Sequence, residues 1–192
     1  MKLTISSPST VLPLALEEVK DHLRVDSDDE DALLSAYLRA ETENVEGTLN
    51  RSLVTQTVDL YLDRFSADGT IDLPRSPVQS VTGVNYTISG ATGTYGSTVA
   101  ATKYTLDTAS TPNRVVLKAN QTWPDATLET DRPVRVRYIA GYGDQGSDVP
   151  EAIRTAILLR VGDRYWNRES ATDKRMYATR AAERLLAPYK VW

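Results

Sequence analysis

Residues 24–50 read RVDSDDEDALLSAYLRAETENVEGTLN, and this stretch passes from a run of acids into a regular apolar pattern. Apolar side chains then recur every three or four positions, as on one face of a helix: Leu33, Leu34, Tyr37, Leu38, Ala40, Val45 and Leu49. Ser27 followed three residues later by Glu30 is the pattern of a capping box, and further acids suit the positive end of a helix dipole. The stretch predicts a helix from about Asp28 to Leu49 with an acidic start.

The spacing of these acids also invites comparison with a calcium-binding loop. An EF-hand loop requires glycine at its sixth position and a bidentate glutamate at its twelfth. Counted from Asp26, those positions hold Asp31 and Tyr37. The acids are therefore interpreted as the start of a helix rather than as a metal site.

The hydrophobic period changes after this helix. Residues 53–63, LVTQTVDLYLD, alternate between apolar and polar side chains, which is typical of a strand. Further short strands are predicted at 71–74, 81–89, 103–107, 114–118 and 133–143. Helical periods are predicted at 14–24 and 28–49 before the strands, and after Pro150 and at 176–186 beyond them. We therefore predict an α+β fold, a core of about four helices with an antiparallel β elaboration inserted between the N-terminal and C-terminal helical pairs.

The length of 192 residues predicts a single domain around one core. Its predicted parts are the N-terminal helices (1–52), the β-rich insertion (53–141), the C-terminal helices (150–187) and a short tail (188–192). No apolar run approaches the roughly 20 residues that cross a bilayer. The chain has no cysteine, so disulfides and thiolate metal sites are excluded.

Charge is distributed unevenly along the chain, whose formal net charge is −4. Residues 1–50 hold 11 acids and 4 bases, whereas residues 151–192 hold 5 acids and 9 bases. Such ends could pair within one subunit or between neighbouring subunits. The candidate interface side chains are therefore the acids Asp28, Asp29 and Asp31 and a stripe of arginines at four-residue steps, Arg160, Arg164 and Arg168. The stripe has a second interpretation, contact with DNA phosphates.

Catalytic motifs find little support in the sequence. Residues 141–146, GYGDQG, fit the dinucleotide pattern G-x-G-x-x-G, but no helix opens at the third glycine, so the motif is interpreted as a turn. His22 is the only histidine. The sequence gives no reason to select any two of the 26 acids as a catalytic carboxylate pair for hydrolysis. We predict no enzymatic activity, no cofactor and no bound metal; a carboxylate hydrolase would need two carboxylates converging in a pocket.

Three blocks of the chain, at residues 16–41, 76–86 and 138–170, together resemble the head–tail connector proteins of long-tailed bacteriophages. These proteins are also called adaptor or head-completion proteins, and gene transfer agents carry counterparts. The most specific parts are the opening LEEVKDHLRVD, residues 16–26, and the closing GYG and VPEAIR, residues 141–143 and 149–154. The resemblance covers nearly the whole chain.

This resemblance implies a structural role in the virion, at the head–tail interface, for a protein made in the cytoplasm of the bacterial host. The implied assembly is a ring, usually of twelve copies, beneath the portal protein, joined to a stopper or tail-terminator protein. Duplex DNA would pass through the ring without sequence-specific binding, and no membrane is involved. The alternative function is a DNA-binding packaging accessory protein that uses the arginine stripe.

The C-terminal residues 187–192, APYKVW, form a candidate docking tail. They place aromatic and apolar groups at the end of the chain, where order usually requires a contact. Such a tail either folds back onto the core or binds a partner, and the resemblance to connectors implies that the partner is the portal. The candidate portal-binding residues are Tyr189, Lys190, Val191 and Trp192.

Overall fold

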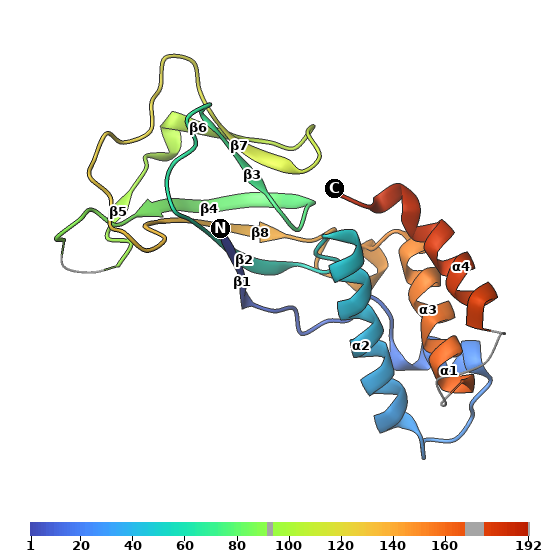
Figure 1. Cartoon of the computed structure of the whole chain (residues 1–192). Helices are drawn as coiled ribbons and strands as arrows, with labels where there is room; N and C mark the ends of the chain where they lie inside the picture. Colours follow the sequence, from blue (N-terminus) through green and yellow to red (C-terminus); the bar gives the residue numbers. More distant parts are fainter. Residues whose placement is uncertain (92–93, 168–174, 192) are drawn as a thin grey trace. The chain divides into compact units, whose positions relative to one another are not determined.

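The structure is a computed structural model that describes residues 1–91, 94–167 and 175–191, with the side chains of 175–179 left aside (Figure 1). The predicted α+β fold is confirmed: the described residues form four α-helices and two antiparallel sheets. The helices are α1 (Leu16–Leu23), α2 (Asp31–Leu49), α3 (Glu151–Trp166) and α4 (Arg175–Leu186). The strands are β1 (Lys2–Ser7), β2 (Gln56–Leu62), β3 (Thr70–Leu73), β4 (Val78–Tyr86), β5 (Ser97–Thr98), β6 (Tyr104–Asp107), β7 (Asn113–Leu117) and β8 (Val134–Ala140).

These elements belong to two compact units, each assembled from separate stretches of the chain. The β unit consists of Met1–Pro8 and Thr55–Gly141, and the helical unit consists of Ser9–Val54 and Tyr142–Trp192. Each unit has its own cluster of buried apolar side chains. The chain therefore passes from one unit to the other three times.

In the helical unit, α3 packs against each of the other three helices (Figure 1). Its buried face consists of Ile153, Ala156, Ile157 and Val161, as the helical period predicts. These side chains meet buried residues of α2, among them Leu34, Leu38, Val45 and Leu49, and Val19 and Leu23 of α1. The N-terminal and C-terminal helical pairs thus share one core.

In the β unit, a five-stranded sheet of order β1-β2-β8-β4-β5 lies with a three-stranded sheet of order β3-β7-β6 around one core. Strand β8 shows why the sheet has two different faces, because its residues alternate between buried and half-buried along its whole length. Val134, Val136 and Tyr138 point into the core. Val58 and Leu60 of β2 join them there.

Strand β1 was not predicted from the sequence. It pairs antiparallel with β2, with Leu3 opposite Leu60 and Ile5 opposite Val58. The local pattern in residues 2–7 is short and mostly polar, and the pairing partner lies more than fifty residues further along the chain. Only the completed sheet makes these six residues a strand.

Candidate interaction surfaces

Two arginines of the predicted stripe bind one buried acid. Arg160 Nε donates to Glu41 Oε2 at 2.8 Å, and Arg164 Nη2 lies 2.6 Å from Glu41 Oε1. The Glu41 side chain is 5% exposed, and Arg164 also lies over the ring of Tyr37, with its Cζ 5.7 Å from the ring centroid. The arrangement fastens α3 to α2 through a charge-assisted contact at the side of the core.

Pairing within one chain was one of the alternatives that the sequence left open for the arginine stripe. The structure shows such pairing for Arg160 and Arg164. Arg168 lies outside the described residues. The partner Glu41 was missed, although a signal existed: it stands one turn from Leu38 and Val45 on the apolar face, where a charged side chain needs a counter-ion.

Two acids near the start of α2 form ion pairs with a buried lysine. Lys20 of α1 has a side chain that is 6% exposed, and its Nζ lies 2.5 Å from Asp28 Oδ1 and 3.0 Å from Asp31 Oδ1. Hydrogen bonds to these carboxylates raise the pKa of Lys20, and the hydrogen bond from Lys20 lowers the pKa of Asp28. Two of the three candidate interface acids thus bind a lysine within the chain, and the third, Asp29, is exposed and accepts a hydrogen bond from Ser27 Oγ at 2.6 Å.

The predicted capping box at Ser27 and Glu30 is wrong. Helix α2 begins at Asp31, and no side chain caps it. Ser27 Oγ instead accepts from the backbone N–H of Asp29 at 3.1 Å, in a local turn, and the Glu30 carboxylate accepts from the hydroxyl of Tyr165. Short polar side chains often bind backbone donors close to them in sequence. The Ser27 hydroxyl therefore stabilises the local turn at Asp29 and does not cap the helix.

The C-terminal segment folds back onto the helical unit. The backbone N–H of Val191 donates to the carbonyl of Leu49 at 3.1 Å, and Arg51 Nε donates to the carbonyl of Tyr189 at 2.5 Å. Val191 is 7% exposed, so the expectation that it is presented as an exposed docking group is corrected. Tyr189 and Lys190 are half-buried, and Trp192 lies outside the described residues.

The five-stranded sheet presents a polar face opposite its core. Directly opposed residues share a face, so the register defines two polar rows across the strands. We call these residues the open face: Lys2, Tyr61, Arg135, Asn85 and Thr98 in one row, and Thr4, Asp59, Arg137 and Gly83 in the next. The alternation of Arg135 and Arg137 with the valines of β8 was visible in the sequence, but the rest of each row depends on non-local pairing.

Within the open face, Asp59 and Arg137 form a bidentate ion pair. Arg137 Nε and Nη2 each donate to one Asp59 oxygen at 2.7 Å. The Asp59 side chain is only 3% exposed. The hydrogen bonds from Arg137 hold the pKa of Asp59 below its ordinary value, although burial opposes this shift.

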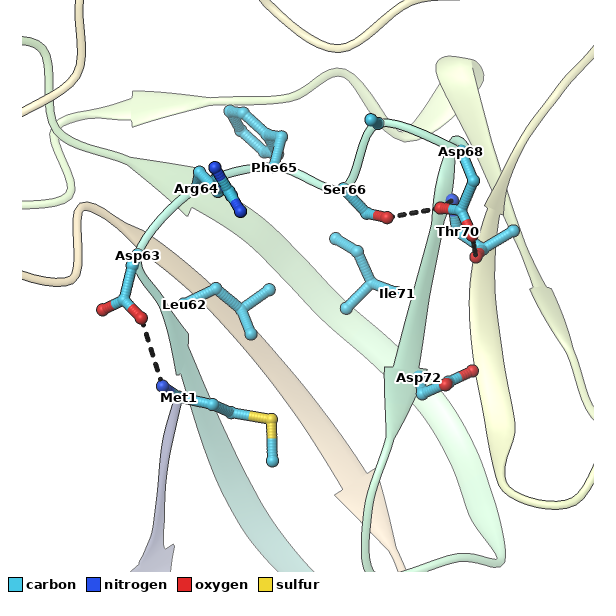
Figure 2. Close-up of a pocket in the computed structure, with 11 residues that line it drawn as sticks. Met1, Leu62, Asp63, Arg64, Phe65, Ser66, Asp68, Thr70, Ile71 and Asp72 are labelled. Atoms are coloured by element: carbon cyan, nitrogen blue, oxygen red, sulfur yellow. Dashed lines mark hydrogen bonds and ion pairs between the residues drawn. The ribbon is translucent and has the colours of Figure 1, made fainter.

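A hollow of about 670 Å³ lies beside the turn that joins β2 to β3 (Figure 2). Its apolar lining includes Leu62, Phe65 and Ile71. Two of its acids already have partners, because Asp63 accepts from the N-terminal amine at 3.2 Å and Asp68 accepts from Thr70 Oγ1 at 2.9 Å. The hollow therefore offers no converging pair of free carboxylates of the kind that a hydrolase would need.

In the part of the chain that the structure describes, no group of three or more histidine, cysteine or acid side chains is placed to hold a metal ion. Among the described helices, none is both long and apolar enough to cross a membrane.

The GYGDQG segment consists of bends, and a single 3-10 turn, Gly146–Asp148, begins at its third glycine ahead of α3. Gly141 has a φ of +138°, which favours glycine. A Cβ at Gly146 would lie 2.7 Å from the carbonyl oxygens of both Leu12 and Pro13, so the third glycine permits close backbone packing rather than phosphate binding. Asp148 accepts from the backbone N–H of Gln145 at 2.9 Å and completes the turn before α3.

Solved structures with the same fold come from gene transfer agent particles. A chain of the virion of a native particle is 23% identical with a TM-score of 0.81, and a chain of the neck of an empty particle, computed with C6 symmetry, is 24% identical with a TM-score of 0.82. A chain of the neck of a native particle, computed with C12 symmetry, is 25% identical with a TM-score of 0.77. Each likeness covers 100% of this chain and 96% of the other. None of the curated proteins compared with the chain matches it.

The model of one protein family, described as phage gp6-like head-tail connector protein, matches residues 14–109. This match covers half of the chain, from before α1 to beyond β6. The sequence resemblance to head–tail connectors is thereby confirmed. The chain belongs to the phage gp6-like head-tail connector family, as a structural component of a phage or gene transfer agent type of particle and not as an enzyme.

Proposed function

We propose that twelve copies of the chain form a closed ring in the neck of the particle, beneath the portal protein. The observation that carries this proposal is the full-length likeness to a chain of a native particle neck computed with C12 symmetry. The ring would extend the DNA channel of the portal and give a stopper or tail-terminator protein a surface to bind. The subunits would be made in the cytoplasm of the host and act in the virion.

A closed ring requires two different faces of one subunit to meet, because each copy contacts its two neighbours in the same head-to-tail sense. The uneven charge along this chain supports such an arrangement. Duplex DNA would pass without sequence-specific binding. The DNA-binding alternative gains no support from the described arginines of the stripe, because Arg160 and Arg164 are both paired with Glu41.

The test is electron microscopy of the purified chain mixed with purified portal protein. We expect twelvefold density added to the lower face of the portal ring. Portal rings without added density, or open filaments of the chain, would contradict the proposed assembly. A sample of the portal protein alone provides the reference.

The C-terminal segment is the part that we propose to meet the portal. Val191 holds the segment on the helical unit, so a portal contact would use the neighbouring Tyr189, Lys190 and Trp192. Trp192→Ala leaves the buried valine in place and is expected to weaken co-sedimentation with the portal at an unchanged melting temperature. Full co-sedimentation of this variant would remove the terminal aromatic group from the proposed contact.

A further inference from the structure

The open face carries two cations that have no ion-pair partner in the described residues. Arg137 is neutralised by Asp59, but no carboxylate of the described residues pairs with Lys2 or Arg135. Both stand in the same row, on either side of Tyr61. The face is therefore positively charged.

Arg135 is the more informative of these two cations. Its guanidinium lies over the ring of Tyr95, with Cζ 4.7 Å from the centroid, and Tyr95 in turn packs against Tyr61 with ring centroids 5.8 Å apart. The Arg135 Nε is buried and has no hydrogen-bond acceptor in the part of the chain that the structure describes. A buried donor without an acceptor is costly. Arginine and tyrosine are also the residue types that are enriched where a partner covers a protein surface.

The chemistry of the face indicates a partner that carries carboxylates. Guanidinium groups bind carboxylates in a planar, directional contact. The neutral side chains of the same row, Asn85 and Thr98, are already joined by a hydrogen bond of 2.8 Å. The groups of this row that lack a partner among the described residues are therefore its cations.

The chain itself offers exposed carboxylates on α1. Glu17 and Asp21 are one turn apart on this helix, and Asp26 follows in the next loop. All three are exposed, and none of their side chains has a hydrogen bond or an ion pair within the described residues. We call these three residues the acidic flank. Arg24 is exposed nearby and leaves the flank with a net negative charge.

We propose that the open face of one copy binds the acidic flank of the neighbouring copy. This inference rests on the proposed ring, which requires two different complementary faces on every subunit. One face lies on the β unit and the other on the helical unit, so every copy can give one and receive the other. Charge complementarity of this kind fixes the order and direction in which subunits join.

The first test uses charge reversal in assembled particles. Particles are produced with Arg135→Glu, or with Glu17→Lys plus Asp21→Lys, as the only copy of the chain, and the ratio of chain to portal is measured by quantitative mass spectrometry. We expect each variant to lower this ratio by about tenfold or more, because like charges placed together at an interface are strongly unfavourable. Lys118→Glu and Glu43→Lys reverse exposed charges elsewhere and should leave the ratio unchanged.

The second test combines the two defective variants. Their co-expression creates rings of alternating copies, in which each contact pairs either two original faces or two reversed faces. We expect the ratio to recover to within about twofold of the wild-type value, and the triple variant alone to recover in the same way. If the single variants failed only because their surface charge had changed, neither co-expression nor the triple variant would restore assembly.

Several results would overturn the inference. If only the Arg135→Glu variant fails, the face binds DNA or another neck protein. If both variants fail and neither combination restores assembly, the two faces do not meet. Because Arg135→Glu could disturb Asp59, Lys2→Glu on the exposed edge of the sheet is tested beside it, and normal assembly of that variant also counts against the inference. Absence of the wild-type chain from the neck would instead refute the proposed function itself.

Discussion

Gly146 lies where a side chain would meet main-chain atoms. Its Cβ would be 2.7 Å from two carbonyl oxygens of the segment before α1. We expect Gly146→Ala to lower the free energy of unfolding by about 1–3 kcal/mol, because the backbone must move apart. Gly47→Ala is the matched control, because a Cβ there meets nothing within 4 Å and should stabilise α2 by about 0.5–1 kcal/mol. Urea unfolding measures both, and equal effects of the same sign would contradict the expectation.

Asp59 makes the β unit sensitive to acid. Its pKa is lower in the folded chain than in the unfolded chain, so the ion pair stabilises the fold above about pH 4, the ordinary pKa of an aspartate, and this contribution is lost as pH falls through the folded pKa. At pH 7, Asp59→Asn should cost about 2 kcal/mol, less than for a fully buried pair because Arg137 is 38% exposed.

The measurement is urea unfolding of both chains between pH 7 and pH 3. The wild-type advantage should shrink toward the acid end. Asp72→Asn, at an exposed acid of β3, serves as the control and should change stability by less than about 0.5 kcal/mol. A wild-type advantage that stays constant down to pH 3 would show that Asp59 acts through packing and not through its charge.

The contact between α2 and α3 depends on Glu41. Glu41→Gln keeps the shape but leaves Arg160 and Arg164 without a counter-ion at the side of the core, and should cost about 2–3 kcal/mol. Glu43→Gln, at an exposed acid on the same helix, should cost less than about 0.5 kcal/mol. Thermal unfolding at neutral pH compares the two, and similar losses would mean that the arginines find other partners.

The C-terminal segment is expected to stabilise the helical unit. Deleting residues 188–192 removes the buried side chain of Val191 and two hydrogen bonds, one to Leu49 at the end of α2 and one from Arg51, two residues beyond it. We expect a loss of about 2–3 kcal/mol in urea unfolding, from apolar burial and the hydrogen bonds together. An unchanged stability would mean that the segment is free for docking, as the sequence alone allowed.

The elements of this chain differ in how far the sequence could predict them. All four helices were located, because their apolar periods are local, and β2 and β8 were located by alternation. Strand β1 and the order of the sheet were not, because both depend on partners far along the chain. Glu41 could have been noticed as a charged residue on an apolar helix face, but nothing next to Arg160 in sequence identifies it as the partner. In the same way, nothing next to Asp28 points to Lys20.

Substitutions in the two units are expected to change the free energy of unfolding independently. Asp59 lies on the open face of the β unit, and Glu41 lies beside the core of the helical unit. The costs of Asp59→Asn and Glu41→Gln should therefore add to within about 0.5 kcal/mol in the double variant, because the two sites share no partner among the described residues. Hydrogen exchange should locate the first change in β2 and β8 and the second in α2 and α3. A clearly non-additive double variant would show that the two sites are energetically coupled.

The position of β8 in the middle of the five-stranded sheet has a consequence for synthesis on the ribosome. Strand β1 is translated some fifty residues before β2, and β8 is translated last although it lies between β2 and β4. The facing edges of β2 and β4 therefore stay unpaired in the growing chain until residue 140 has emerged from the ribosome. The core of the helical unit forms later still, because it needs α3 and α4. Non-local pairing of this kind slows folding and leaves strand edges open to other chains in the meantime. Nascent chains of this connector that stall before β8 are the form most exposed to misassembly.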